Sequence, residues 1–346
     1  MSMPNDTQNQ DEILNQPSCL VIGGGISGLI ASRILQRQGI KVTVLDKGRG
    51  IGGRLATRRV SSPDYGKGIF DYGLQHFQVT DPKFQEIVDT WIKVGLVEPW
   101  SDGFYNSEGN FQKSDKAFYR GIESNRSIAK YLAKDLNVLT QQRIVKLQWH
   151  NHQWVVNSQQ GDSFSGNNLL ITSPIPQSLD LLDNSNLEIP PDIRNNLEKV
   201  IYNRCIAVLA FLDKPSQIPE PGGLWLDGEY LTWIASNHKK GISPEAYAVT
   251  LHGNAEFSLA NWEVDRDMVA QKMIDVAQPW LGTKVVSYQV HGWKFSQPST
   301  SYGKPYAVIK EPGNLIFAGD AFSSQRNVEG AVLSGIAAAE YIIQNS

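Results

Sequence analysis

The chain has 346 residues, 41% of them apolar, and a formal net charge of −3 at pH 7. This length and apolar content suit two domains or one large one with a proper core. The charge lacks the basic excess that marks nucleic-acid binding, so we expect small-molecule partners and no nucleic acid.

The chain shows no targeting, membrane or metal signal. Residues 1–16 are polar without an apolar stretch, which predicts a disordered tail rather than a secretory signal. Apolar runs are too short for a membrane span, so we expect no membrane anchor. Cys19 and Cys205 lie in apolar runs and are expected to be buried thiols of a cytoplasmic protein. No Cys/His cluster has metal-ligand spacing, and no metal site is expected.

The first ordered elements form a strand, a glycine-rich turn and a helix. Residues 19–22 predict a buried strand, Gly23-x-Gly25-x-x-Gly28 follows at once, and a helical pattern runs on to Gly39. A second apolar strand over 42–45 ends on Asp46, which is 46 − 28 = 18 residues after Gly28. This arrangement is typical of a dinucleotide-binding fingerprint.

Each position in that fingerprint has a physical task. The glycines permit the tight turn, the approach of a pyrophosphate and close packing of helix on strand. Free N–H groups at the helix N-terminus favour phosphate, and an acid after the second strand accepts hydrogen bonds from a ribose diol. That acid argues against the 2′-phosphate of NADP, whereas FAD and NAD both remain open. We expect dinucleotide contacts from Gly23, Gly25, Ile26, Ser27, Gly28 and Asp46.

A second glycine-rich run, residues 47–59, follows directly. Its glycines allow another close backbone approach, and its arginines can add positive charge beside a diphosphate. The run resembles the second glycine motif of the monoamine oxidase class of FAD enzymes, which favours FAD over NAD. A solvated basic loop is the alternative. The cofactor contacts expected here are Lys47, Arg49, Gly53 and Arg54.

The middle of the chain changes its periodicity twice. Helical patterns cover 81–92, 124–136, 177–182, 192–200 and 264–280, and 100–119 is an aromatic loop or strand. Short strands with polar turns are predicted over 138–139, 143–148, 153–158, 163–164 and 168–173, as in the β-meander of an FAD domain. Further strands are predicted over 202–212, 224–226, 231–235, 247–252 and 285–293, in a half rich in tryptophan.

The C-terminal region returns to cofactor-like patterns. Residues 314–320 predict a strand ending in Gly319–Asp320, followed by a small-residue helix that reaches about residue 343. This resembles the closing flavin motif of the monoamine oxidase class, in which the Asp contacts the ribityl-pyrophosphate end. The resemblance adds cofactor contacts at Gly319, Asp320, Val328, Glu329 and Ala331, and places Gln75 and the backbone of Ile144 beside FAD.

These patterns predict an α/β fold, in which an FAD-binding Rossmann-like domain is interleaved with an α+β substrate domain on a mostly antiparallel sheet. We assign 17–78, 137–185 and 290–346 to the FAD-binding domain, and 79–136 and 186–289 to the substrate domain.

Several middle segments resemble those of renalase-like enzymes. They are residues 71–84, 233–240, 249–252, 291–298 and 319–331. The resemblance spans nearly the whole chain, with His76 at a position where relatives often carry Tyr. It implies oxidation of 2- or 6-dihydro-NAD(P), with hydride passing to flavin N5 and O2 then giving hydrogen peroxide and NAD(P)⁺. It also suggests His252, Asn237 and Trp293 as catalytic candidates, although a strand histidine and core tryptophans are the alternatives.

Two other functions stay open. The chain could be another flavoenzyme of this fold, either an amine oxidase or a polyene or porphyrin dehydrogenase, or a non-catalytic flavin-binding protein. We expect FAD to be non-covalent, because neither cysteine lies near the C-terminal flavin motif in the sequence. Oligomeric state has no sequence signal.

Overall fold

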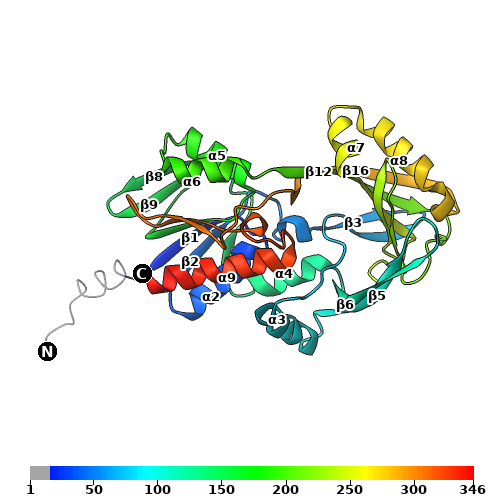
Figure 1. Ribbon diagram of the computed structural model, residues 1–346, viewed down its shortest axis with the longest axis horizontal. Coiled ribbons are helices and arrows are strands. Elements are labelled where there is room, and N and C mark those ends of the chain that lie inside the picture. Colours follow the sequence, from blue (N-terminus) through cyan, green and yellow to red (C-terminus); the bar gives the residue numbers. More distant parts are fainter. Residues whose placement is uncertain (1–15) are drawn as a thin grey trace.

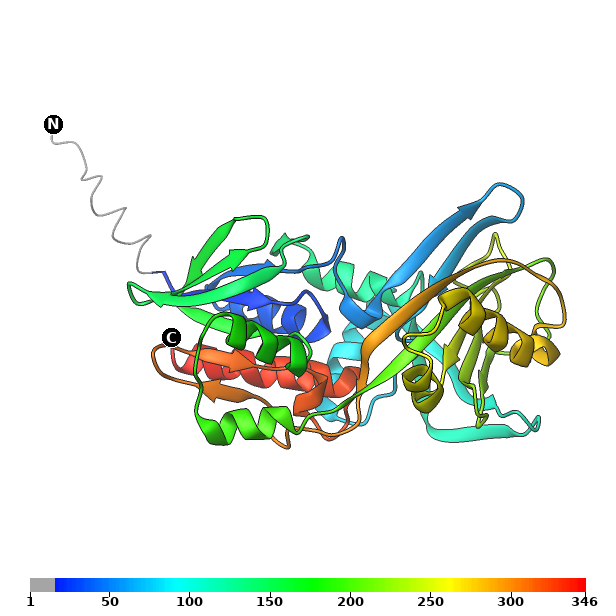
Figure 2. The same ribbon diagram turned by 90° about the horizontal axis from the view of Figure 1, so that it is seen from above.

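The computed structural model describes residues 16–346 and has two lobes arranged along one long axis (Figures 1 and 2). The tail predicted over 1–16 lies outside the described residues except for Gln16, whose side-chain amide donates to the carbonyl oxygen of Gly39 at 3.2 Å. Two long strands, β12 (Tyr202–Leu212) and β16 (Val285–Pro298), run between the lobes.

The first lobe contains a six-stranded sheet in the order β17-β18-β11-β1-β2-β7. Its strands are parallel except for the edge strand β17, which is antiparallel to β18. Their bounds are β1 Ser18–Ile22, β2 Lys41–Leu45, β7 Asn137–Leu139, β11 Asn168–Ile171, β17 Ala307–Ile309 and β18 Leu315–Phe317. The parallel sheet confirms the Rossmann-like fold expected from the first glycine motif.

Helices cover both faces of this sheet, as the alternating strand side chains require. Leu20 and Ile22 of β1 pack toward α5 (Ile175–Asn184) and α6 (Pro191–Glu198). Cys19 and Val21 pack toward α2 (Ile26–Arg37) and α9 (Val328–Gln344) on the other face (Figure 1). The meander of β8 (Ile144–His150), β9 (Gln153–Ser158) and β10 (Ser163–Gly166) lies beside the sheet.

The second lobe is built on a seven-stranded sheet in the order β16-β12-β15-β14-β13-β5-β6. It is antiparallel apart from the β13–β5 pair, which confirms the mostly antiparallel substrate sheet. The remaining strands are β5 Val97–Tyr105, β6 Phe111–Gly121, β13 Gly223–Trp225, β14 Leu231–Ser236 and β15 Ala248–Gly253. Helices α7 (Ala255–Ala260) and α8 (Arg266–Leu281) cover one face.

Between the lobes lie α3 (Pro82–Lys93), α4 (Asn125–Ala133) and two short 3₁₀ turns, η1 (Gly53–Leu55) and η2 (Asp320–Phe322). The hairpin of β3 (Thr57–Ser62) and β4 (Gly66–Asp71) extends from the first lobe over the second (Figure 2). Phe70 packs edge-on against Phe211 of β12, with ring centroids 5.2 Å apart.

Several elements differ from the sequence-based expectation. No strand was predicted within the second glycine-rich run, residues 47–59, but β3 begins at Thr57 and pairs with β4. Helix α7 and strand β17 were not expected, because six and three residues are too few to show a period. Strand β16 runs to Pro298, beyond the predicted end at residue 293, and the predicted domain boundary before residue 290 falls inside it. The domain limits themselves remain a prediction.

Candidate cofactor and substrate site

The first glycine motif forms a turn that leaves an open surface at the N-terminus of α2. Gly23 has a φ of +115°, which favours glycine. A Cβ on Gly28 would lie 2.2 Å from the carbonyl oxygen of Gly23, whereas a Cβ on Gly25 would meet no atom within 4 Å. Gly28 therefore permits close packing inside the protein, and Gly25 borders open space where a pyrophosphate can approach the helix N-terminus.

Asp46 joins the two glycine motifs at the end of β2. Its carboxylate accepts hydrogen bonds from the backbone N–H of Gly24 at 2.6 Å and of Gly48 at 2.7 Å. Each carboxylate oxygen can accept more than one hydrogen bond, so this arrangement leaves capacity for ribose hydroxyls. The backbone N–H of Gln142 donates to the Asp46 carbonyl oxygen, which brings the start of β8 and Ile144 to the same edge.

The second glycine motif lies directly against the first. The N–H of Gly52 donates to the carbonyl oxygen of Gly24 at 2.8 Å, and a Cβ on Gly53 would lie 3.5 Å from the Cα of Gly25. Lys47 and Arg49 are exposed, and Lys47 donates to the side-chain oxygen of Gln177 at 2.6 Å.

Arg54 connects this motif to the C-terminal motif. Its guanidinium forms two hydrogen bonds with the Asp320 carboxylate, at 2.5 and 2.8 Å, and one with the carbonyl oxygen of Ser296 at 3.0 Å. Asp320 follows Gly319, whose N–H donates to the Ser334 hydroxyl at 2.9 Å. Residues 54 and 320 are 266 positions apart, so the tertiary fold assembles this part of the predicted cofactor site.

The other α9 residues that were expected to contact the cofactor pack against α2 or join α9 to α3. Val328 and Ala331 are buried against Ile26 and Leu29 of α2. The Glu329 carboxylate is buried and accepts hydrogen bonds from the N–H of Thr80 at 2.6 Å, the N–H of Asp81 at 3.0 Å and the Thr80 hydroxyl. Glu329 thus fixes the first turn of α9 to the start of α3.

The buried polar atoms near the motifs that have no partner within the described residues include the Ser27 hydroxyl and the side-chain oxygen Oε1 of Gln75. Buried polar atoms are normally hydrogen-bonded, so each marks a place where a ligand can supply the missing partner. Both lie where FAD contacts are expected. With the open face of Gly25 and the acid at position 46, these residues fit an FAD at the carboxyl ends of the parallel strands, the usual ligand position.

Residues 71–76, between β4 and α3, connect the cofactor motifs to the substrate sheet. The N–H of Leu74 donates to the carbonyl oxygen of Arg54 at 2.8 Å. A Cβ on Gly73 would lie 2.3 Å from that oxygen and 3.1 Å from the Trp293 ring. This segment is therefore held between the second glycine motif and β16.

The carbonyl oxygen of Tyr72 organises two of the three predicted catalytic residues. It accepts hydrogen bonds from the Trp293 indole at 2.9 Å and from Nε2 of His252 at 3.0 Å. Because a carbonyl only accepts, His252 carries its proton on Nε2 and presents Nδ1 as an acceptor. Burial lowers the pKa of His252 to about 4, which keeps the ring neutral at pH 7. Tyr72 and Trp293 also stack, with ring centroids 5.2 Å apart.

His252 and Trp293 lie on the same face of the seven-stranded sheet. His252 of β15 is opposite Trp233 of β14 on one side and Ala207 of β12 on the other, and Ala207 is in turn opposite His291 of β16. The helices α7 and α8 cover the other face. We call the face toward the cofactor motifs the aromatic wall, defined as Phe104, Trp225, Trp233, His252, His291 and Trp293.

His76 is enclosed by the outer part of this wall. Its ring centroid lies 4.7–6.2 Å from those of Trp100, Phe104, Phe118, Trp225 and Trp233. Burial, and then the nearby Lys240 ammonium, lower the pKa of His76 to about 3. The sequence indicated an excess of tryptophan in this half, and the structure shows where those rings gather.

Asn237 does not lie on the wall. Its side chain is completely buried, accepts a hydrogen bond from the N–H of Asp71 at 3.3 Å and donates to the Thr250 hydroxyl at 2.9 Å. The amide is enclosed by neighbouring residues, and the expected role of Asn237 on the substrate face stays a prediction.

Sequence reasoning missed the buried pair of Asp71 and Lys240. Their side chains have no exposed surface, and the ammonium lies 2.9 Å from the carboxylate. A lysine in the polar run Asn-His-Lys-Lys-Gly is expected to be exposed. The only available signal was that Asp71 ends an apolar strand, where a charge needs a partner when buried.

Cys205 lies in the substrate-side sheet, where it pairs with Trp293 across β12 and β16. Burial raises the pKa of its thiol to about 12, so the sulfur stays protonated. This protonated thiol adds to the sequence-based case against a thioether, and non-covalent attachment stays a prediction.

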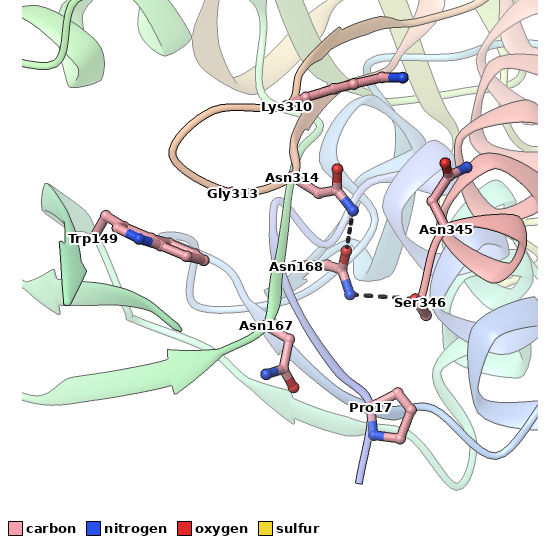
Figure 3. Close-up of a pocket in the computed structure, with 9 residues that line it drawn as sticks. All are labelled: Pro17, Trp149, Asn167, Asn168, Lys310, Gly313, Asn314, Asn345 and Ser346. Atoms are coloured by element: carbon pink, nitrogen blue, oxygen red, sulfur yellow. Dashed lines mark hydrogen bonds between the residues drawn. The ribbon is translucent and has the colours of Figure 1, made fainter. Parts of the chain in front are cut away.

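A polar pocket of about 430 Å³ lies elsewhere in the first lobe (Figure 3). It is at the amino ends of β1 and β11, the opposite edge from the glycine motifs. It is lined by Pro17, Trp149, Asn167, Asn168, Lys310, Gly313, Asn314, Asn345 and Ser346. We do not assign it to the cofactor site. Within residues 16–346, no helix is long and apolar enough to cross a membrane, and no His, Cys, Asp or Glu cluster could hold a metal ion.

The fold and the two glycine motifs define a flavoprotein of the amine oxidase type. Residues 21–91 match the family model of the NAD(P)-binding Rossmann-like domain, and residues 106–343, more than half of the chain, match that of the flavin containing amine oxidoreductases. The chain belongs to the flavin-containing amine oxidoreductase family, it is an oxidoreductase, and FAD is its cofactor.

Individual relatives refine this assignment. The chain is 23% identical to renalase from Mus musculus over 92% of its own length and 96% of the relative. A structure of a putrescine oxidase variant superposes with a TM-score of 0.71 at 13% identity, over 96% of this chain and 99% of that one. A protein from Exiguobacterium assigned as a protoporphyrinogen oxidase gives a TM-score of 0.70 at 13% identity, over 95% and 99%. The renalase likeness confirms the resemblance seen in the sequence.

Proposed function

We propose that this protein oxidises 2- or 6-dihydro-NAD(P) to NAD(P)⁺ and passes the electrons to O2, giving hydrogen peroxide. The observation that carries the proposal is the similarity to renalase over nearly the full length of both chains. FAD supplies the hydride acceptor, at N5, and the site for reoxidation by O2. The protein has to orient the substrate and exclude water.

A cation beside the wall favours this substrate over an amine. The Arg58 guanidinium lies 4.9 Å from the centroid of the Tyr72 ring, which stacks on Trp293 of the wall. Amine substrates are cationic at neutral pH and are disfavoured beside this guanidinium. A dihydronicotinamide dinucleotide has a neutral ring, which suits the aromatic wall, and anionic phosphates, which suit a cation beside it.

Named residues have distinct tasks in this proposal. Tyr72 and Trp293 present stacked rings against which a planar substrate ring can pack. His252, held by the Tyr72 carbonyl, offers Nδ1 to a donor such as a carboxamide N–H. Near-attack placement within about 3–3.5 Å makes such a transfer fast, so the wall acts mainly by fixing the pose.

The test is anaerobic mixing of the FAD-loaded protein with candidate donors while the flavin absorption is followed. We expect rapid bleaching by 2- or 6-dihydro-NAD(P), much slower bleaching by the ordinary 4-isomer and little by putrescine. Air should restore the yellow colour with peroxide release. Equal rates with all three isomers would contradict the single fixed pose.

A second candidate is another flavoenzyme of the same fold. The structural likeness to a putrescine oxidase favours an amine oxidase, and that to the Exiguobacterium protein favours a porphyrin dehydrogenase; a polyene dehydrogenase belongs to the same group. Bleaching by an amine or a porphyrinogen, with none by dihydronicotinamides, would select this candidate. Bound flavin that no donor reduces would indicate a non-catalytic flavin-binding protein.

A further inference from the structure

The buried pair of Asp71 and Lys240 has an unusual position. Taking two charges out of water is costly, and well-packed apolar residues often stabilise a protein as much as a buried ion pair does. Stability alone therefore gives little reason for a lysine and an aspartate with no exposed surface here. The geometry of the pair offers another reason.

Lys240 forms hydrogen bonds with both ends of the segment from Asp71 to Gln75, and we call this arrangement the clamp. Its ammonium donates to the Asp71 carboxylate at 2.9 Å and to the Gln75 carbonyl oxygen at 2.6 Å. The face of the Trp100 ring lies 4.9 Å away. An ammonium group has three N–H donors. Its three neighbours here are the Asp71 carboxylate, the Gln75 carbonyl oxygen and the face of the Trp100 ring.

Asp71 is fixed from the other side as well. Its carboxylate accepts from the Thr57 hydroxyl at 2.6 Å and from the N–H of Asn125 at 3.2 Å. Its carbonyl oxygen accepts from the Gln75 side-chain amide at 2.5 Å and from the Thr250 hydroxyl at 3.1 Å. These contacts come from β3, α4 and β15, so Asp71 is held to three separate elements.

The clamped segment carries the contacts that orient the wall. Tyr72 is the first residue inside the clamp, and its carbonyl oxygen holds both His252 and Trp293. Leu74, also inside it, is bonded to Arg54 of the second glycine motif. A shift of this segment would therefore move the substrate-side rings relative to the cofactor motif.

We propose that Lys240, through its pair with Asp71, is a positioning residue that sets the distance and orientation of His252 and Trp293 relative to the flavin. It does so by holding the 71–75 segment at both ends. The assignment deepens the proposed function and rests on it for its kinetic part only.

The test uses a paired variant, because Lys240→Met alone would leave Asp71 charged and buried, and such a protein can fail to fold. The double variant Asp71→Asn/Lys240→Met removes both charges at similar volume. Its Asn side-chain oxygen can still accept from Thr57 and Asn125. Lys272→Met is the matched control, because Lys272 also lies over an aromatic ring, that of Tyr230 at 4.4 Å, but is exposed on α8.

Two readouts separate positioning from stability. Anaerobic flavin reduction at saturating dihydronicotinamide should slow by about 10²-fold in the double variant, the scale expected for a small misplacement, while the FAD dissociation constant stays within about threefold, a change under 1 kcal/mol. Nitrogen-15 NMR of histidine-labelled protein should show that His252 no longer carries its proton on Nε2 alone. The control should match the wild type in both.

The possible outcomes separate the positioning role of the pair from the proposed function. A folded double variant with unchanged reduction rate and unchanged His252 signals would show that the pair is only structural, and would overturn the positioning role. If the wild type is not reduced by any dihydronicotinamide, the proposed function fails, but the NMR comparison still tests whether the clamp orients His252. A changed His252 tautomer in a folded protein supports the inference in either case.

Discussion

The cofactor end and the aromatic wall are built in different ways. The cofactor end is built mainly from two glycine-rich backbone turns close together in sequence, with room for a ligand at Gly25, and only its Arg54–Asp320 contact joins distant segments. The wall consists of side chains brought together from distant strands, as in the contact of His252 with the carbonyl of Tyr72, 180 positions away. A backbone site depends on small residues at fixed spacing, whereas a side-chain site depends on the whole sheet.

The comparison predicts the largest effect at Gly28. Gly28→Ala places a Cβ 2.2 Å from the Gly23 carbonyl oxygen, so helix and strand must separate, at a cost of about 1–3 kcal/mol in unfolding free energy. We expect FAD-free protein with a lower melting temperature. A Gly28→Ala variant that melts like the wild type and keeps its flavin would show that the packing is misjudged.

Gly25→Ala is the matched variant. Residue 25 has an extended backbone, with φ −77° and ψ 175°, and its new Cβ would meet no protein atom within 4 Å. The apoprotein should melt as the wild type does. FAD should bind at least about tenfold more weakly, because the methyl group enters the pyrophosphate path. Titration of apoprotein with FAD measures this, and unchanged affinity would place the pyrophosphate elsewhere.

Asp46→Ala should weaken FAD binding without unfolding the protein. It removes a charge-assisted hydrogen bond to ribose, worth about 1.5–3 kcal/mol, or roughly ten- to hundredfold in affinity. Because Asp46 also accepts from Gly24 and Gly48, Asp46→Asn is the useful comparison, since it keeps one acceptor. An unchanged FAD dissociation constant in the Asp46→Ala variant would mean that the motif is misread.

This division also explains how far the sequence could predict the molecule. The glycine spacing, Asp46 and the apolar strands were readable because each acts locally, and Gly23, Gly25 and Gly28 lie as the fingerprint predicts. Arg54 with Asp320 could be expected only from a family resemblance. Asp71 with Lys240 could not be predicted, because a lysine is buried only when tertiary structure supplies its partner, here 169 positions away.

The buried histidines at the wall predict that the free energy of unfolding depends on pH, whereas the cofactor end predicts no such dependence. Burial lowers the pKa of the wall residues His252 and His291 to about 4, and that of His76, which packs against the wall, to about 3, from 6.5. Below pH 6.5 the unfolded chain binds protons that the folded protein does not, so stability falls as pH decreases from about 6.5 to about 4. His252 and His76 each contribute up to about 1.4 kcal/mol per pH unit in that window.

His76→Phe should therefore lose less stability than the wild type between pH 7 and pH 5, since one of these histidines is absent. Urea unfolding at both pH values measures the difference. His150→Phe, at the exposed end of β8, is the control and should lose as much stability between the two pH values as the wild type. Equal losses in all three proteins would argue that His76 is protonated in the folded state.

The smallest expected change concerns covalent attachment. Cys19 and Cys205 are buried, and burial raises the pKa of each thiol to about 12. Acid precipitation should leave the flavin in the supernatant, and Cys205→Ser should release it equally. Colour retained in the wild-type pellet but not in the variant would reveal a thioether at Cys205.

The central claim is that the cofactor end binds FAD whereas the wall orients the substrate. Its most direct test is the rate of anaerobic flavin reduction in FAD-saturated His252→Ala. We predict a rate at least about tenfold lower than in the wild type, because substrate orientation is lost, with an unchanged FAD dissociation constant. FAD-saturated Gly25→Ala should show the reverse, weak FAD binding with near wild-type reduction. Wild-type reduction by His252→Ala, or loss of its FAD affinity, would contradict the account.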